Sequence, residues 1–164
     1  MRHKPVPEPP ASLDAVETVR AALPRTPRPE SDCCARVVDR TDVADRDDAA
    51  TWLTFLRALG LANEVDGKFV RTDAAVAPGP LADAFEANVY AAREVLDALA
   101  DADRPLDADA VFERVESVVP RWERERNPDW EATWRERVAR LLGWASLLGL
   151  VERRETGYVL PDER

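Results

Sequence analysis

The sequence predicts a mainly α-helical α+β fold in which short helices are followed by small β-hairpins. Two amphipathic segments end in the same triplet, Leu59-Gly60-Leu61 and Leu148-Gly149-Leu150. Each triplet is followed by a glycine-containing turn and then by an aromatic–valine pair, Phe69-Val70 or Tyr158-Val159, at an offset of 89 residues throughout. A helix that leads directly into a hairpin, twice at one spacing, predicts an internal repeat of two units.

Residues 12–73 form the first predicted unit, after a flexible, proline-rich tail at residues 1–11. Three amphipathic helices are expected, and Ser12 and Asp45 are favourable N-caps for the first and the third. The Asp66-Gly67 dipeptide then lies between two short segments of β-type sequence. Because this dipeptide is preferred in two-residue hairpin turns, the unit is expected to end in a hairpin.

Residues 81–164 form the second predicted unit, which a linker or hinge at residues 74–80 separates from the first. A long helix is expected over about 81–100, and a second helix follows Asp107. A long loop then leads to Asn127-Pro128-Asp129. Asn127 can serve as an N-cap, Pro128 suits the first helical position and Asp129 adds negative charge to the first turn, so a third helix is predicted to start here. A second hairpin closes the unit.

Three helices and a hairpin, present twice, resemble two winged helix-turn-helix domains in tandem. The segment from Arg135 to Leu160 also resembles the small winged helix at the N-terminus of Mrr-type restriction proteins, whose arginine-containing helix ends in Leu-Gly-Leu-like residues. The nuclease domain of those proteins has no counterpart in this sequence. The resemblance therefore implies a fold that binds DNA or docks onto proteins, without their catalytic activity.

The charge balance is strongly acidic, with 32 acidic against 23 basic residues and a net charge of −9. Only Lys4 and Lys68 are lysines. This acidic, lysine-poor composition is similar to that of proteins from salt-loving archaea. At molar salt the Debye length falls to about 3 Å, so the net charge argues only weakly against nucleic-acid binding. No apolar run approaches the length of a membrane span and no apolar leader is present, which predicts a cytoplasmic protein.

Residues able to carry catalysis or bind a metal are scarce. The sole histidine is His3 in the tail, and the two cysteines, Cys33 and Cys34, cannot complete a tetrahedral zinc site. A vicinal disulfide is an alternative to two buried thiols, but a reducing cytosol disfavours it. We therefore expect a non-enzymatic protein with no cofactor, no metal and no small-molecule substrate.

Arginines gather in the second unit around its third helix and wing. In winged helices that bind DNA, this helix enters the major groove and the wing reaches the phosphates. Pairing of Glu131 with Arg135 and of Glu136 with Arg140 is the competing interpretation. Arg137, at the edge of the apolar arc, either joins a partly buried ion pair or faces a ligand. The candidate DNA contacts are Arg121, Arg124, Arg126, Arg135, Arg140, Arg153 and Arg154.

The third helices of both units also share a face of small residues. Glycine in a helix interior costs about 1 kcal/mol relative to alanine, so Gly143 suggests close approach of another backbone. Trp122, in the long loop, is expected to cover one end of the core. The candidate interface residues are Ala50, Thr54, Ala139 and Gly143.

Two functions remain open from the sequence. The first is binding of double-stranded DNA by the second unit, in a transcriptional or genome-maintenance factor. The second is a protein-interaction adaptor that uses the winged helices as docking or dimerisation surfaces. The first unit favours the adaptor, because Arg46, Asp47, Thr51 and the Glu64-Val65 pair leave little positive charge where its recognition surface would lie.

Overall fold

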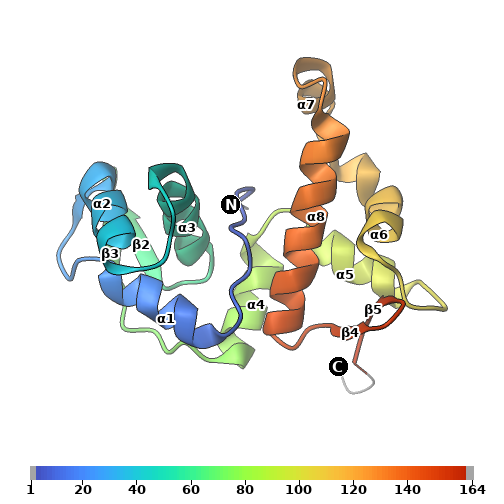
Figure 1. Cartoon of the computed structure of the whole chain (residues 1–164), viewed down its shortest axis with the longest axis horizontal. Coiled ribbons are helices and arrows are strands. Elements are labelled where there is room, and N and C mark those ends of the chain that lie inside the picture. Colours follow the sequence, from blue (N-terminus) through green and yellow to red (C-terminus); the bar gives the residue numbers. More distant parts are fainter. Residues whose placement is uncertain (1–2, 162–164) are drawn as a thin grey trace. The chain divides into compact units, whose positions relative to one another are not determined.

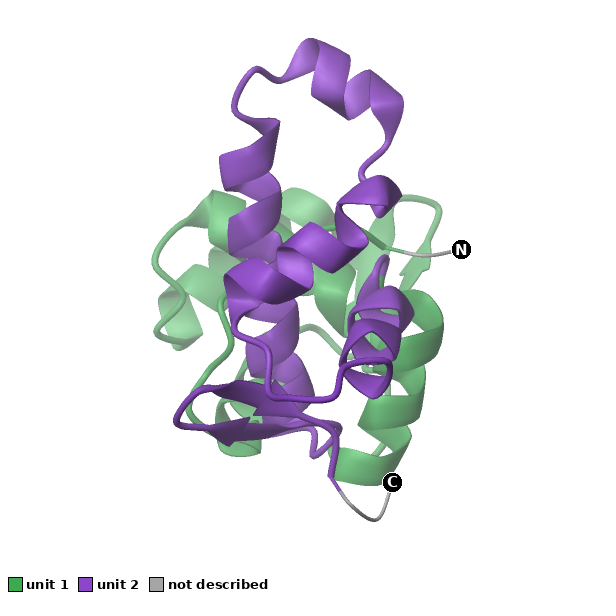
Figure 2. Ribbon diagram, turned by 90° about the vertical axis from the view of Figure 1, so that its right-hand side faces the viewer, with its two compact units in different colours: residues 1–89 green, residues 90–164 purple. Residues whose placement is uncertain are grey.

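The computed structural model describes residues 3–161, and the chain divides into two compact units between Val89 and Tyr90. Figure 2 shows the two units in different colours. Both share one order of elements: a helix, a short extended segment, further helices and an antiparallel hairpin (Figure 1). The predicted α+β class with small hairpins is therefore confirmed.

Unit 1 is built around a three-stranded antiparallel sheet with strand order β1-β3-β2. Arg28 of β1 pairs with Phe69 of β3, and Asn63 of β2 pairs with Val70 of β3. β1 lies between the first and second helices, so the first helix is tied to the hairpin through it. The elements are α1 (Leu13–Ala22), β1 (Arg28–Pro29), α2 (Glu30–Arg40), α3 (Arg46–Ala58), β2 (Ala62–Val65), β3 (Lys68–Arg71) and α4 (Pro78–Asn88).

The core of unit 1 is formed by the apolar faces of these helices against the sheet. Leu53 and Phe55 of α3 are fully buried, as the helical spacing predicts. Asp45 caps α3 by accepting a hydrogen bond from the Asp48 backbone N–H at 2.9 Å. Cys33 and Cys34 are buried as free thiols, so the disulfide alternative is not realised.

Helix α4 corrects the predicted linker and the predicted boundary between the units. The linker expected at 74–80 runs into α4, because Pro78 and Pro80 occupy its first turn, where their missing N–H groups cost nothing. The phenyl rings of Phe85 and Phe55 lie 6.4 Å apart, and the Asn88 side-chain amide donates to the Ala58 carbonyl at 2.9 Å. α4 therefore belongs to unit 1.

The single helix predicted over 81–100 is also two helices in the structure. α4 ends at Asn88, and α5 begins at Ala92 after Ala91, whose φ of 71° is left-handed. Residues 1–2 of the tail expected to be flexible lie outside the described residues, and residues 3–11 contact unit 1: the His3 N–H donates to the Asn88 carbonyl at 2.7 Å, and Val6 is 4% exposed. The buried Val6 side chain holds this part of the tail against the protein, which the composition of the tail does not indicate.

Unit 2 repeats the arrangement with a two-stranded hairpin. Leu106 takes the place of β1, since it forms an isolated antiparallel bridge with Tyr158. Asp107 caps α6 by accepting from the Ala110 N–H at 2.8 Å, as predicted. The elements are α5 (Ala92–Ala100), α6 (Ala108–Val115), the 3₁₀ turn η1 (Glu116–Val118), α7 (Arg121–Arg126), α8 (Trp130–Leu147), β4 (Glu152–Arg154) and β5 (Gly157–Val159).

Comparison of the two sheets shows where the units differ. The bridge positions Arg28 and Leu106 are 78 residues apart, whereas their partners Phe69 and Tyr158 are 89 apart. Unit 2 therefore gains 11 residues between its second and third helices. This insertion contains η1 and α7, so the segment expected to be a loop is partly helical. α8 begins at Trp130 rather than next to Asn127.

Candidate nucleic-acid interface

Helix α8 carries the central part of the predicted site, and its apolar face fixes its orientation. Trp134, Val138, Leu141 and Leu142 are all buried. The Trp134 indole Nε1–H donates to the Glu123 Oε2 atom of α7 at 2.7 Å, which fastens the inserted helix to α8. The polar side of α8 is thereby placed away from the core.

Arg135 of α8 lies against α6 instead of facing outward. Its Nη1 atom is 3.0 Å from Asp109 Oδ1, and its guanidinium lies 4.5 Å from the centre of the Phe112 ring. The expected pair with Glu131 is therefore replaced by contacts to α6. Arg140 does form the expected i,i+4 pair, with its Nη2 atom 2.8 Å from Glu136 Oε1.

Arg137 is half-buried within unit 2. Its guanidinium lies 4.5 Å from the centre of the Trp134 ring, and its buried Nη1 atom makes no hydrogen bond within the described residues. Burial lowers the pKa of this guanidinium; Glu123 opposes that shift, and Arg140 adds to it. Arg137 is therefore partly buried as one alternative expected, but within the described residues its contact is with an aromatic ring and not with an ion-pair partner.

The three arginines of α7 differ in their surroundings. Arg121 is 92% exposed and pairs with Glu125, with 3.0 Å between Nε and Oε1. Arg124 donates to the Glu116 carbonyl and stacks over the Trp130 ring at 4.5 Å, so it holds the insertion in place. Arg126 is exposed.

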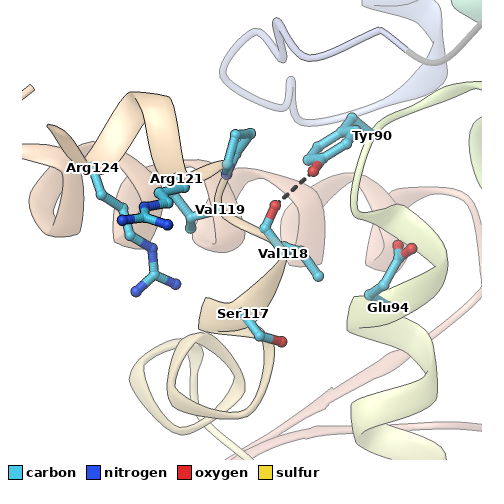
Figure 3. Close-up of a pocket in the computed structure, with 8 residues that line it drawn as sticks. Tyr90, Glu94, Ser117, Val118, Val119, Arg121 and Arg124 are labelled. Carbon is cyan, nitrogen blue, oxygen red and sulfur yellow. Dashed lines mark hydrogen bonds between the residues drawn. The ribbon is translucent and has the colours of Figure 1, made fainter. Parts of the chain in front are cut away.

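A cavity of about 690 Å³ lies beside the inserted helix (Figure 3). Arg121 and Arg124 border it on one side and Glu94 on the other. Two other lining residues are joined by a hydrogen bond, in which the Tyr90 hydroxyl donates to the Val118 carbonyl at 2.6 Å. Trp122 is 54% exposed, so the expectation that it covers one end of the core is wrong.

The wing supplies the remaining two candidate arginines. Arg153 and Arg154 are exposed on β4, and Arg154 makes a 3.4 Å contact with Glu152. The 18 residues of α8 separate the wing from α7, which corresponds to about 27 Å at 1.5 Å per residue. Five of the seven predicted arginines therefore form two groups beyond opposite ends of α8, and Arg135 and Arg140 lie on α8 between these groups.

Comparison with known proteins adds one decisive match. The whole chain, residues 1–164, matches the model of a family described as halobacterial double winged helix domain. The chain belongs to this family. No curated protein and no solved structure matches the sequence. The resemblance of unit 2 to Mrr-type proteins stays a resemblance.

The family assignment agrees with the paired helix–hairpin units of this double winged helix protein. Its small-residue faces are only partly open: Ala139 is exposed, whereas Ala50, Thr54 and Gly143 are half-buried. Their role as an interface stays a prediction. Within residues 3–161, no helix combines the length and apolarity that crossing a membrane requires.

Sequence reasoning overlooked a group of arginines in unit 1 of this double winged helix protein. Arg20, Arg25 and Arg71 come from α1, the following loop and β3, and they border one cleft. They are far apart in sequence and share no helical period. Only the pairing of β1 with β3 beside α1 brings them together, so no local pattern could have indicated the cluster.

Proposed function

We propose that the protein binds double-stranded DNA through unit 2, as a non-enzymatic transcriptional or genome-maintenance factor. The observation that carries the proposal is the exposure of Arg153 and Arg154 on the hairpin that directly follows the third helix. This is the position from which a wing reaches backbone phosphates. Arg140, on the polar side of α8, would extend the contact toward the groove.

The ion pairs around these arginines do not oppose the proposal. Arg140–Glu136 and Arg154–Glu152 are surface pairs, which typically contribute about 0–1 kcal/mol to stability. A phosphate offers a guanidinium two parallel charge-assisted hydrogen bonds, which are stronger. Both arginines can therefore exchange a carboxylate for a phosphate at little cost.

We propose a different role for two of the seven candidates. Arg135 lies over Phe112 and Arg124 over Trp130, so we propose that both position helices. Arg121 and Arg126 belong to the group at the far end of α8. The proposed contact set is thus Arg140, Arg153 and Arg154.

The test is fluorescence anisotropy of a labelled duplex titrated with the full chain across a series of potassium chloride concentrations. A protein that neutralises phosphates loses affinity by about 0.9 log unit per log unit of salt for each phosphate. The triple variant Arg140→Ala, Arg153→Ala, Arg154→Ala is expected to lower the affinity at least about tenfold. Its salt dependence should be shallower by the amount that corresponds to about two to three fewer phosphate contacts.

The matched control is Arg93→Ala, an exposed arginine of α5 outside the proposed contact set. It should leave the affinity within about twofold of the parent protein. Equal loss in the control and the triple variant would show nonspecific charge attraction and refute the assignment. Absence of duplex binding at every salt concentration would refute the DNA function itself.

A protein-interaction adaptor is the second candidate, because large apolar side chains lie open on both units. Trp122 is 54% exposed on α7, and Val65 is 50% exposed at the hairpin of unit 1. Exposed aromatic residues are enriched at protein interfaces. Two results together would favour this function. The protein would form a dimer or a protein complex that Trp122→Ser abolishes, and it would not bind the duplex.

A further inference from the structure

Six arginines of unit 1 come from α1, the loop that follows it, β1, α2 and β3, in a chain whose net charge is −9. Arg20, Arg25 and Arg71 border a cleft of about 440 Å³ together with Glu17, Thr72 and Asp73. Arg28, Arg40 and Arg71 are close enough to Arg36 for their charges to lower its pKa, although burial is the main cause of that shift. The arginine cluster is Arg20, Arg25, Arg28, Arg36, Arg40 and Arg71.

The backbone of α1 holds part of this arginine cluster in place. The last carbonyls of a helix carry partial negative charge and lack partners within the helix. Arg36 Nε donates to the Ala22 carbonyl at 2.9 Å, and Arg71 Nη1 donates to the Ala21 carbonyl at 3.0 Å. Two guanidinium groups from α2 and β3 are thus fixed at one end of α1.

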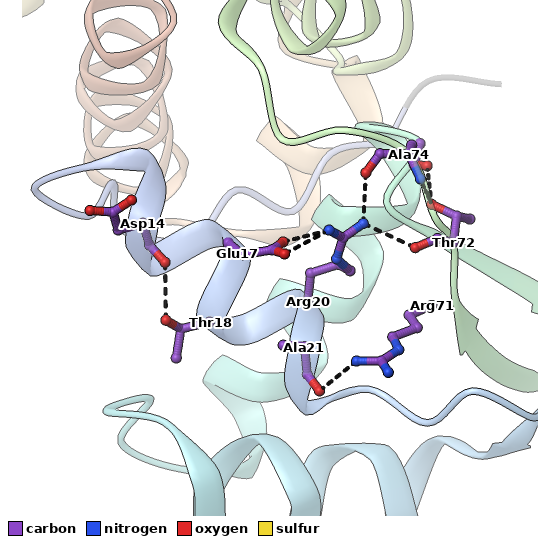
Figure 4. A network of polar contacts seen from close by, with 9 residues as sticks. Asp14, Glu17, Thr18, Arg20, Ala21, Arg71, Thr72 and Ala74 are labelled. Carbon is purple, nitrogen blue, oxygen red and sulfur yellow. Dashed lines mark hydrogen bonds and ion pairs between the residues drawn. The ribbon is translucent and has the colours of Figure 1, made fainter.

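Arg20 also lines the cleft, and Figure 4 shows its side-chain contacts. Its Nη1 atom donates to the carbonyls of Thr72 and Ala74 at 3.0 and 2.7 Å, and its Nη2 atom pairs with Glu17 Oε2 at 2.6 Å. Arg20 therefore shapes the cleft and has its charge compensated. Asp73 is the other carboxylate that borders the cleft.

The remaining arginines have donors to spare. A guanidinium carries five N–H donors, and the hydrogen bonds described for Arg36 and Arg71 use one each. Arg25, Arg28 and Arg40 are exposed, and within residues 3–161 their side chains make no ion pair. In the lining of the cleft, three arginines outnumber the two carboxylates of Glu17 and Asp73, so the lining carries a net positive charge.

We propose that the arginine cluster of unit 1 binds phosphate groups. Guanidinium forks fixed by backbone carbonyls are preorganised for bidentate contact with phosphate oxygens. The cleft falls within the ordinary size range of ligand sites, about 300–1,000 Å³, and its polar lining suits an anion. The phosphate belongs either to a free nucleotide or to a nucleic-acid backbone. This site lies outside the helix and wing proposed for unit 2 and does not depend on that proposal.

The experiment follows the arginine Nε–H resonances of the full chain by ¹H–¹⁵N NMR at constant ionic strength. Three probes are titrated separately: inorganic phosphate, adenosine monophosphate and a short duplex. The duplex is added to the Arg140→Ala, Arg153→Ala, Arg154→Ala background, so that the contact proposed for unit 2 is removed. Saturable shifts of the Arg36 and Arg71 Nε–H resonances are expected with at least one probe.

The variant Arg25→Ala, Arg40→Ala separates binding from folding, because neither side chain makes a described hydrogen bond. It is expected to weaken probe binding at least fivefold and to leave the thermal unfolding midpoint unchanged. Arg46→Ala, exposed at the start of α3, is the matched control and should bind as the parent does.

The outcomes are distinct. Shifts with all three probes identify a free phosphate or nucleotide site, and shifts with the duplex alone identify a backbone contact. No saturable shift with any probe, or shifts equally present in Arg25→Ala, Arg40→Ala, would overturn the proposal. If unit 2 does not bind DNA, its triple variant behaves as the parent protein does, and the result for unit 1 still stands.

Discussion

Arginine performs several different tasks in this chain, and the difference lies in what each guanidinium contacts. Arg36 and Arg71 hydrogen-bond to helix carbonyls, whereas Arg135 and Arg137 lie over aromatic rings. A planar, always charged group suits both arrangements. Helical spacing predicted the Arg140–Glu136 pair, because both residues lie on one helix. It could not predict the Asp109 partner of Arg135, which depends on how α6 and α8 pack.

Arg137→Met tests whether this half-buried charge stabilises unit 2. Methionine keeps an unbranched side chain against Trp134 and removes the Nη1 donor that lacks a hydrogen bond. A buried unsatisfied donor costs about 1–3 kcal/mol, and a cation–π contact returns about 0.5–2 kcal/mol. The free energy of unfolding is therefore expected to stay equal or to rise by up to about 1 kcal/mol.

Urea unfolding followed by tryptophan fluorescence and circular dichroism measures this change. Arg153→Met, on the exposed wing, is the control and should lie within about 0.5 kcal/mol of the parent. A loss of more than about 1 kcal/mol in Arg137→Met would mean that the charge itself stabilises the unit.

The elements that sequence predicted well are those defined by local signals. Asp45 and Asp107 cap their helices, and Asp66-Gly67 forms its turn. β1, the bridge at Leu106 and the packing of α4 escaped prediction because each depends on a partner distant in sequence. The same reason explains why the positions of Arg153 and Arg154 on the second hairpin could be predicted, whereas the arginine cluster of unit 1 was not found.

Gly157→Ala tests the β-bridge between Tyr158 in the hairpin of unit 2 and Leu106, which lies between α5 and α6. Gly157 has a φ of 147°, and a Cβ atom there would lie 2.4 Å from the Leu106 carbonyl carbon. The two backbone segments cannot move apart without breaking a hydrogen bond, because the Tyr158 N–H donates to the Leu106 carbonyl at 2.8 Å. Left-handed strain and overpacking together are expected to cost about 2–4 kcal/mol.

The readouts are the thermal unfolding midpoint and faster hydrogen exchange at the Tyr158 amide. Gly79→Ala in α4 is the control, because a Cβ atom at Gly79 meets nothing within 4 Å. It should stabilise the protein by up to about 1 kcal/mol through reduced chain entropy. Unchanged exchange at Tyr158 in Gly157→Ala would contradict the bridge.

At the scale of the whole molecule, the position of α4 defines where unit 1 ends. A fragment of residues 1–77 lacks α4, and a fragment of residues 1–89 retains it. Burial of a phenylalanine side chain such as Phe85 contributes about 1.5–3 kcal/mol, and 1 kcal/mol shifts the melting midpoint of a small domain by about 4–8 °C. The shorter fragment is expected to melt at least about 6 °C lower.

Circular dichroism melts of both fragments check this boundary. The 1–89 fragment carrying Phe85→Ala should lose most of the difference, because it removes the contact with Phe55. Equal midpoints for the two unmodified fragments would place the boundary before α4, as the sequence suggested.

The net charge of −9 makes the stability of the whole chain dependent on salt. Like charges repel more in the compact state, and this repulsion is screened as the Debye length falls from about 10 Å at 0.1 M to about 3 Å at 1 M. The melting midpoint is therefore expected to rise between 0.1 and about 1 M potassium chloride.

The control is a variant that lacks three exposed negative charges, none of which caps a helix: Asp42→Asn, Asp83→Asn, Glu131→Gln. Its midpoint should start higher and rise less with salt than that of the parent protein. Equal slopes for the parent and this variant would mean that salt acts by strengthening apolar burial instead of by screening charge.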